Sequence, residues 1–178
     1  MSLFVVRHGQ TDWNKEMLIQ GRIDIPLNEE GIAQAKLTAS KLSDVPLDAI
    51  YVSPLLRARQ TAAYINEGRN IPLIVDERIQ EEYYGDMEGK PRSGEAYLTQ
   101  RKSFFKRYPN GEGYLDVVAR VYPFLNEIKE TRKGQNVLLV CHGGMSRVVN
   151  SYFYDMENDE FVSFGLENCQ VARYEFKY

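Results

Sequence analysis

Short apolar runs alternate with amphipathic stretches along the chain, and this pattern predicts alternating strands and helices. Runs rich in apolar and β-branched residues predict strands, and the first of them predicts a buried one. The expected strands are residues 3–7, 49–52, 73–75, 136–141 and 171–176. Helical spacing, capping residues and terminating glycines predict helices at about 29–42, 57–65, 97–106, 116–132 and 145–152. Such alternation favours an α/β fold with a mostly parallel sheet.

Two segments do not follow the alternation. Residues 12–26 are polar and are expected to form a loop. Residues 81–113 are rich in glycine, charge and tyrosine, with room for one helix, and are expected to form a small lid segment over the sheet. The sequence contains no repeat, low-complexity tract or linker. A chain of 178 residues is therefore expected to form one domain, residues 1–178.

The two histidines of the chain occupy equivalent places in this pattern. His8 and His142 each follow a predicted strand and each precede a glycine. In an open parallel sheet, ligands bind outside the carboxyl ends of the strands, so both imidazoles are expected at one crevice. An imidazole can accept a phosphoryl group, and the guanidinium of Arg7 can bind phosphate oxygens with its planar fork. This placement favours phosphate chemistry.

Composition excludes several other functions. The chain is 43% hydrophobic and 26% charged with a net charge of −3, which is typical of a globular protein and argues against a general nucleic-acid binder. No segment has the length of a membrane helix or the pattern of a signal peptide. The two cysteines predict reduced thiols and a cytoplasmic location. Two histidines without a supporting carboxylate cluster do not make a typical metal site.

Five motifs in fixed order carry a family resemblance. They are Arg7-His8-Gly9-Gln10-Thr11-Asp12-Trp13-Asn14, Gln20-Gly21 with Asp24-Ile25-Pro26-Leu27 and Gly31 to Ala35, Ser53 to Ala62, Glu81 to Gly89, and His142-Gly143-Gly144. Together they resemble the histidine phosphatase superfamily, which includes cofactor-dependent phosphoglycerate mutases. The resemblance covers nearly the whole chain. It implies a three-layer α/β sandwich, phosphoglycerate-mutase-like, around a mostly parallel central sheet.

The resemblance also implies roles for individual residues. His8 would be the nucleophile that forms a phosphohistidine, and Glu81 would act as general acid and then general base. Arg7, Arg57 and His142 would surround the phosphoryl group and stabilise its charge. The expected phosphate- and substrate-binding residues are Thr11, Asn14, Gln20, Gly21 and Gly143. No metal and no cofactor are implied.

Other polar and aromatic side chains are given ordinary roles. Glu82 stands where the family has an apolar residue and is expected to face solvent or a lid cation. Arg59 is expected to be a solvated charge. Three further arginines are interpreted as ordinary surface cations, with contact to the rest of a substrate as the alternative. They are Arg22, Arg92 and Arg147. The tyrosines interpreted as lid packing, with a pocket role left open, are Tyr83, Tyr84 and Tyr97.

Several functions remain open. The favoured one is a metal-independent phosphomonoesterase that acts on a small phosphorylated metabolite through a phosphohistidine. Phosphoglycerate mutase and α-ribazole phosphatase are alternatives within the family, and a phospho-ligand-binding module without catalysis is another. Cys141 to Arg147 fits Cys-x5-Arg, the phosphate loop of cysteine-based tyrosine phosphatases, but Cys141 completes an apolar strand and is interpreted as structural. The substrate and the oligomeric state are not predicted.

Overall fold

The computed structural model describes residues 1–177 and contains a five-stranded sheet in the order β3-β2-β4-β1-β5. The strands are β1 (Ser2–Arg7), β2 (Ala49–Val52), β3 (Leu73–Val75), β4 (Asn136–Cys141) and β5 (Val171–Glu175). Strand β5 is antiparallel to β1, whereas the other neighbouring pairs are parallel. The predicted strands and the mostly parallel sheet are confirmed.

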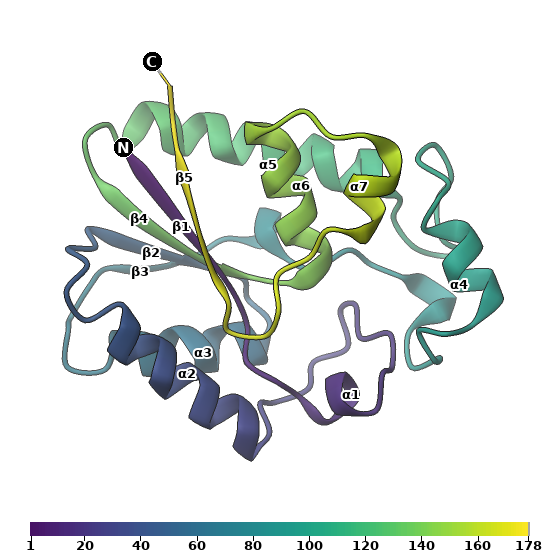
Figure 1. Cartoon of the computed structure of the whole chain (residues 1–178), viewed down its shortest axis with the longest axis horizontal. Coiled ribbons are helices and arrows are strands. Elements are labelled where there is room, and N and C mark those ends of the chain that lie inside the picture. Colours follow the sequence, from purple (N-terminus) through teal and green to yellow (C-terminus); the bar gives the residue numbers. More distant parts are fainter. Residues whose placement is uncertain (178) are drawn as a thin grey trace.

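Helices cover both faces of this sheet (Figure 1). Helices α2 (Glu29–Lys41) and α3 (Leu56–Asn66) lie on one face, and α5 (Tyr114–Thr131) and α6 (Gly143–Phe153) lie on the other. The three-layer α/β sandwich is therefore confirmed. Among residues 1–177, no helix combines the length and the apolarity that crossing a bilayer requires.

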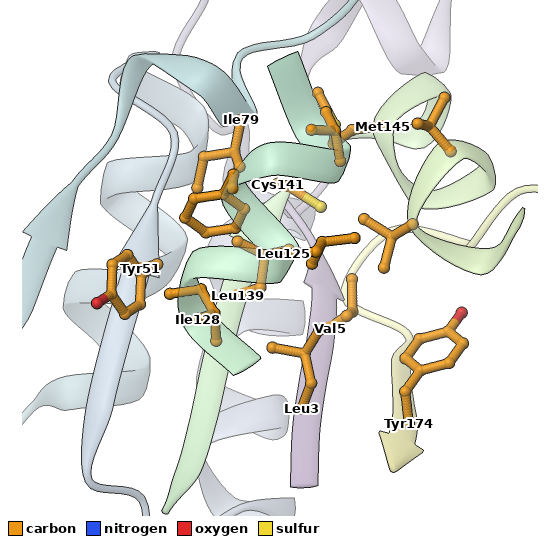
Figure 2. Close-up of a cluster of buried hydrophobic side chains, with 14 of the residues drawn as sticks. Leu3, Val5, Tyr51, Ile79, Leu125, Ile128, Leu139, Cys141, Met145 and Tyr174 are labelled. Atoms are coloured by element: carbon orange, nitrogen blue, oxygen red, sulfur yellow. The ribbon is translucent and has the colours of Figure 1, made fainter. Parts of the chain in front are cut away.

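The core consists of two clusters, one on each face of the sheet. Successive residues of a strand point to opposite faces, so Leu3 and Val5 join the cluster under α5 while Phe4 and Val6 join the cluster under α3. Figure 2 shows the first cluster, in which Leu3, Val5 and Leu139 face Leu125 and Ile128 of α5. Burial of each such side chain stabilises the fold by about 1.5–3 kcal/mol.

Local chemistry explains where the helices begin and continue. Asn28 caps α2, as predicted, because its side chain accepts a hydrogen bond from the Gly31 N–H at 2.9 Å. Helix α5 continues through Pro123, which occurs inside the helix. Pro123 and Ala119, four residues earlier, are exposed, so the carbonyl that loses its partner can bond to water.

The sequence did not predict two short helices, α1 (Asp12–Lys15) and α7 (Asn158–Ser163). Helix α1 lies in the segment expected to be a loop and depends on a capping box between Thr11 and Asn14. The helix expected at 97–106 is α4 (Glu95–Gln100), which ends earlier because the Gln100 side chain donates to the Lys106 carbonyl and fixes a turn.

The lid segment, residues 81–113, has a small cluster of its own. It contains α4 and a short 3-10 helix, Gly85–Met87. Tyr84, Tyr97 and Tyr108 pack with Ile19, apart from the two main clusters. This cluster fixes the segment against the loop that follows β1, beside the carboxyl ends of the central strands.

Candidate active site

The two histidines meet at the edge of the sheet. The parallel register pairs Arg7 of β1 with Cys141 of β4, so the residues that follow, His8 and His142, become neighbours. Their ring centroids lie 5.1 Å apart. The predicted crevice therefore exists, and His8 lines a cavity of about 230 Å³ there.

The hydrogen bonds of His8 fix its tautomer. Nδ1 lies 2.7 Å from the Gly9 carbonyl oxygen, which can only accept, so Nδ1 carries the proton. Nε2 accepts from Arg57 Nε at 3.2 Å and therefore has its lone pair free of a proton. Burial, and then the charges of Arg57 and Arg7, lower the pKa of His8 well below its usual value. His8 is a neutral imidazole with Nε2 available as a nucleophile.

Arg57 and Arg7 place two guanidinium groups beside this ring. Arg57 is 1% exposed, and it donates to the carbonyls of Gly21 at 2.6 Å and Ile23 at 3.0 Å. Gly21 has φ +51°, a conformation that favours glycine, and this turns its carbonyl toward Arg57. Arg7 donates to the Leu166 carbonyl at 2.8 Å. Burial lowers the pKa of Arg57 to about 10, which leaves it charged at neutral pH.

Two amides form another side of the cavity, and Thr11 orients them. Thr11 Oγ1 donates to Gln20 Oε1 at 2.9 Å and accepts from the Asn14 N–H at 3.2 Å. Gln20 Oε1 is thereby occupied, whereas its Nε2 has no partner among residues 1–177. Thr11 itself is fully buried and does not line the cavity. Thr11 was expected to bind phosphate. In the structure it instead orients the side chains of Gln20 and Asn14.

His142 is fully buried and does not line the cavity, so the cavity lining does not support its expected place around the phosphoryl group. Its Nε2 is 2.7 Å from Ser53 Oγ, at the end of β2. Ser53 belongs to the motif Ser53 to Ala62 but was not expected to take part in the site. Its position after a predicted strand was the signal that could have identified it.

Three nitrogen atoms of cavity-lining residues are buried without a partner in the described part of the chain. They are Arg7 Nε, Gln20 Nε2 and Arg101 Nε. A buried donor without a partner is costly, so such atoms mark a place that a ligand completes. An anion with several acceptor oxygens fits this set. The predicted residues that line the cavity are Arg7, His8, Asn14, Gln20, Gly21, Arg57, Glu81 and Gly143.

Glu81 enters the cavity from the lid segment and rests on the start of α6. Its carboxylate accepts from the N–H groups of Gly144 at 3.0 Å, Met145 at 3.1 Å and Glu82 at 3.0 Å. The N–H groups at the start of a helix have no partner within the helix, so this contact satisfies them and fixes the position of the Glu81 carboxyl group. A Cβ atom on Gly144 would lie 2.6 Å from Glu81 Oε1, so only glycine permits this contact.

Glu82 does not face solvent or a lid cation, and that expectation was wrong. Its side chain is turned inward and is 2% exposed. Burial, and then the neighbouring Glu81 charge, raise the pKa of Glu82 to about 8. Glu82 is therefore protonated at neutral pH.

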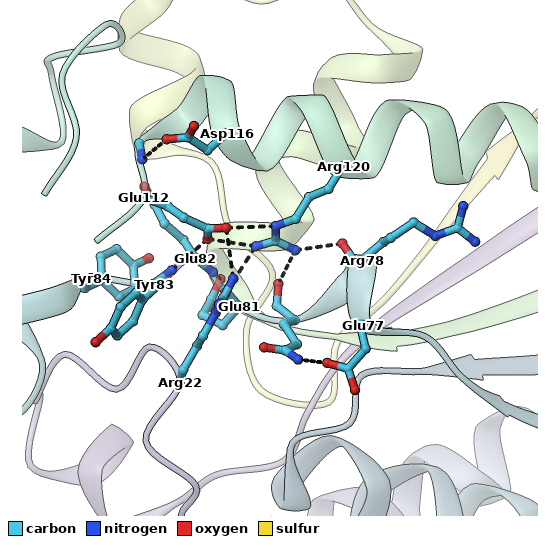
Figure 3. Close-up of polar contacts among 12 residues, drawn as sticks. Arg22, Glu77, Arg78, Glu81, Glu82, Tyr83, Tyr84, Glu112, Asp116 and Arg120 are labelled. Atoms are coloured by element: carbon cyan, nitrogen blue, oxygen red, sulfur yellow. Dashed lines mark hydrogen bonds and ion pairs between the residues drawn. The ribbon is translucent and has the colours of Figure 1, made fainter. Parts of the chain in front are cut away.

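A network of charged residues holds the backbone that carries Glu81 (Figure 3). Arg120 of α5 donates to the carbonyls of Arg78 at 2.6 Å, Gln80 at 2.9 Å and Glu81 at 3.2 Å. Glu112 pairs with Arg120 at 3.1 Å. Each residue that positions Glu81 comes from an element outside the sheet.

Glu112 also joins the lid segment to the loop after β1. It accepts from Arg22 at 2.9 Å and from the Tyr83 N–H at 3.0 Å. Arg22 lies over the Tyr83 ring, with 5.4 Å between guanidinium carbon and centroid. Arg22 is therefore a structural ion-pair partner, and the expectation of an ordinary surface cation was wrong.

Some of the other arginines and tyrosines line the cavity, and others do not. Arg92 and Arg147 line it, against the expectation of surface cations, and so does Arg101, which the sequence analysis did not single out. Arg59 is exposed, as expected. The tyrosines that line the cavity are Tyr84 and Tyr97, whereas Tyr83 does not line it.

Cys141 lies in the main core cluster and is fully buried (Figure 2). Burial raises the pKa of its thiol above the usual value. A nucleophilic cysteine needs the opposite shift, toward the thiolate. The arrangement therefore disfavours the cysteine-based mechanism and agrees with a structural role.

Comparison with known proteins places this site in a family. Residues 3–178 match the model of the histidine phosphatase superfamily (branch 1). Phosphoserine phosphatase 1 of Hydrogenobacter thermophilus is 33% identical over 97% of this chain and 85% of its own. A 2,3-bisphosphoglycerate-dependent phosphoglycerate mutase of Cytophaga hutchinsonii is 32% identical over 98% and 87%. The crystal structure of the α-ribazole phosphatase from Shigella flexneri superposes with a TM-score of 0.87 at 27% identity, covering 99% and 91%. The chain belongs to the histidine phosphatase superfamily and is a phosphatase.

Proposed function

We propose that the protein is a metal-independent phosphomonoesterase that transfers the phosphoryl group of a small phosphorylated metabolite to His8 and then to water. The observation that carries this proposal is the tautomer of His8. With its proton on Nδ1, the ring presents an Nε2 lone pair beside two arginines and lines a cavity that also holds Glu81. Each part required for phosphoryl transfer to nitrogen is then present.

In the first step, Nε2 of His8 gives up the hydrogen bond that it accepts from Arg57 Nε and attacks phosphorus, and the bond to the ester oxygen breaks. Arg7 and Arg57 stabilise the negative charge on the non-bridging oxygens, and the free amide of Gln20 donates to one of them. Glu81, in its protonated form, gives a proton to the departing alkoxide. The products of this step are an alcohol and a phosphohistidine.

In the second step, water replaces the alcohol. Glu81, now a carboxylate, takes a proton from that water as its oxygen attacks phosphorus. The bond between phosphorus and Nε2 breaks, which releases inorganic phosphate and restores neutral His8. The guanidinium groups of Arg7 and Arg57 supply the positive charge throughout, so the proposal includes no metal and no cofactor.

A mutase is the second candidate because one relative carries that name. A mutase returns the phosphoryl group to a bound acid and must keep water away from the phosphohistidine. The family resemblance implies a longer lid region in mutases than residues 81–113 of this chain, which favours hydrolysis. Because the chain is similar to an α-ribazole phosphatase, α-ribazole 5′-phosphate is also a substrate to test.

Purified protein tests the proposal against a panel of phosphomonoesters in excess chelator. The panel contains p-nitrophenyl phosphate, O-phosphoserine, 3-phosphoglycerate, glycerol 3-phosphate and α-ribazole 5′-phosphate. The expected result is release of inorganic phosphate without added metal. Activity that disappears with chelator and returns with magnesium or zinc would contradict the mechanism, and isomerised phosphoglycerate without phosphate release would favour the mutase.

We propose a cytoplasmic location because neither cysteine of the chain forms a disulfide. Cys141 and Cys169 are both free and buried. Reduced thiols are typical of cytoplasmic proteins. The small phosphorylated substrate is the proposed partner, and the net charge of −3 continues to argue against nucleic acid.

A further inference from the structure

Two adjacent phenylalanines in the turns after α4 point in opposite directions. Phe104 packs against the main core cluster, and its ring centroid lies 5.4 Å from those of Tyr114 and Phe161. Phe105 is 91% exposed, more than any other large apolar side chain of residues 1–177. Phe104 therefore holds this part of the chain to the core, while Phe105 projects from it.

Hydrogen bonds fix the turns that carry Phe105. The Ser103 N–H donates to the Gln100 carbonyl at 2.9 Å, and the Lys106 N–H donates to the Ser103 carbonyl at 3.3 Å. The side-chain amide of Gln100, which is 8% exposed, donates to the Lys106 carbonyl at 2.8 Å. The outward direction of Phe105 is therefore set by the fold, although exposure of an aromatic ring to water is unfavourable.

Positive side chains surround Phe105. Residues 96–111 contain four cations and no carboxylate, so the rest of the chain carries a net charge of −7. Arg101 lines the catalytic cavity, whereas the other three cations are exposed: Lys102, Lys106 and Arg107. Among residues 1–177, neither lysine has a carboxylate oxygen within ion-pair distance, and Arg107 pairs with Asp116. The two lysines are available to an anionic partner.

Two exposed leucines extend the apolar part of this surface. Leu115, at the start of α5, is 52% exposed and lines a shallow hollow with Phe105. Leu98 of α4 is 45% exposed and lines another with Lys102 and Glu95. Figure 1 shows α4 at one end of the molecule, away from the sheet. Apolar and basic side chains are thus presented together at an extremity of the protein.

We infer that this surface, defined by Leu98, Lys102, Phe105, Lys106, Arg107 and Leu115, binds a lipid bilayer that contains anionic lipids. Phe105 and the leucines would enter the boundary between headgroups and acyl chains, and the cations would contact lipid phosphates. Such peripheral contact requires no membrane-spanning helix. The inference goes beyond the proposed function and does not depend on it.

Two features favour a bilayer over a protein partner. Lysine is depleted in protein–protein interfaces, whereas lysine together with phenylalanine and leucine is typical of surfaces that lie on membranes. The distribution of charge also orients the molecule. An anionic bilayer attracts residues 96–111 and repels the rest of the chain, with its net charge of −7, so one end of the protein faces the lipid.

Co-sedimentation with vesicles tests the inference. Wild-type protein should bind vesicles of phosphatidylcholine and phosphatidylglycerol but not vesicles of phosphatidylcholine alone, and added salt should weaken the binding. The double variant Lys102→Gln and Lys106→Gln should lower the partition coefficient about 20-fold, because each cation near an anionic surface contributes. Phe105→Ser should lower it about tenfold.

Matched substitutions elsewhere on the surface serve as controls. Leu37→Ser removes a 56% exposed apolar side chain from α2, and Lys15→Gln with Lys41→Gln removes two exposed positive charges. Both controls should keep the wild-type partition coefficient. All changed side chains are exposed, so the midpoint of thermal unfolding without vesicles should be the same in every variant.

Fluorescence reports whether Phe105 itself enters the bilayer. The emission of Phe105→Trp should shift to shorter wavelength with anionic vesicles, whereas the wild-type emission, from Trp13 alone, should not shift.

Three outcomes would overturn the inference. They are equal binding to both kinds of vesicle, wild-type partition in the lysine and Phe105→Ser variants, and no binding to either vesicle. Binding to immobilised polyglutamate, together with none to vesicles, would assign the surface to an acidic protein instead.

Discussion

At the scale of single residues, the chemistry depends on which His8 nitrogen holds the proton. The family resemblance identifies His8 but does not reveal a tautomer. The Gly9 carbonyl, 2.7 Å from Nδ1, determines it. If Nε2 carried a proton, whether in the other neutral tautomer or in the imidazolium cation, it would have no lone pair with which to attack phosphorus. Burial and two arginines keep the ring neutral, and therefore reactive.

The first prediction separates Glu81 from Glu82. Glu81→Gln should lose about 10²–10⁴-fold in kcat/KM on an alkyl phosphate, because the alkoxide needs a proton as it departs, and far less on p-nitrophenyl phosphate. Glu82→Gln should lose little on either ester. The reason differs from the sequence-based one: Glu82 is a buried neutral acid at pH 7, and glutamine resembles that form.

Comparison of kcat/KM for the two esters checks this prediction. That quantity covers the steps up to phosphorylation of the enzyme, so hydrolysis of the phosphohistidine does not affect it. A leaving-group-dependent loss in Glu82→Gln, together with none in Glu81→Gln, would reverse the assignment of the two carboxylates.

The second prediction concerns stability and pH. The pKa of Glu82 is raised by burial from 4.5 to about 8, so between these values the folded chain holds a proton that the unfolded chain has lost. Stability from this group is present below pH 4.5 and falls as pH rises toward 8, by up to about 4 kcal/mol. Glu82→Gln removes that slope.

Urea unfolding of wild type and Glu82→Gln at pH 5 and pH 8 measures the difference. The variant should gain stability relative to wild type on going from pH 5 to pH 8. The exposed Glu16→Gln is the matched control. A constant difference between wild type and Glu82→Gln at the two pH values would show that Glu82 is ionised in the folded protein.

At the scale of elements, the site depends on contacts between segments that lie far apart in the sequence. Helix α5 supplies Arg120, which donates to three backbone carbonyls before and at Glu81, and the lid segment supplies Glu112, which pairs with Arg120. The start of α6 supplies N–H groups to the Glu81 carboxylate. The acid is therefore positioned from both sides.

The third prediction tests this support. Glu112→Gln weakens the pairs with Arg120 and Arg22 and should cost about 1–3 kcal/mol of unfolding free energy. Because Glu81 loses its alignment, kcat/KM on an alkyl phosphate should fall more than kcat/KM on p-nitrophenyl phosphate. The control is Glu130→Gln, which breaks the exposed pair with Lys133 and should change stability by less than about 0.5 kcal/mol. Equal losses on both esters would limit Glu112 to a role in stability.

The sequence predicted the regular elements because apolar spacing determines them. The five strands and the long helices follow runs such as 136–141, which remain buried. Helices α1 and α7 were missed because four to six residues cannot display a period, and caps stabilise them instead. The inward turn of Glu82 was missed because irregular backbone gives no alternation from which a direction can be read.

At the scale of the whole molecule, arginine side chains are concentrated at one cavity. The chain carries a net charge of −3, yet five arginines converge on one cavity. Topology explains how His8 and His142 meet, since adjacent parallel strands end side by side. The sequence therefore predicts that His8 and His142 lie close together. It could not supply the convergence of Arg92, Arg101 and Arg147, because they come from irregular segments and from one helix, with no shared spacing.

The phosphorylated enzyme provides the most direct measurement of the central claim. Rapid quenching during turnover of a ³²P-labelled ester in excess chelator, followed by peptide mapping, locates the label. The expected result is an acid-labile, base-stable phosphohistidine at His8, absent in His8→Ala and retained in Cys141→Ser. A phosphorylated Cys141, or turnover in His8→Ala at the wild-type rate, would contradict the account.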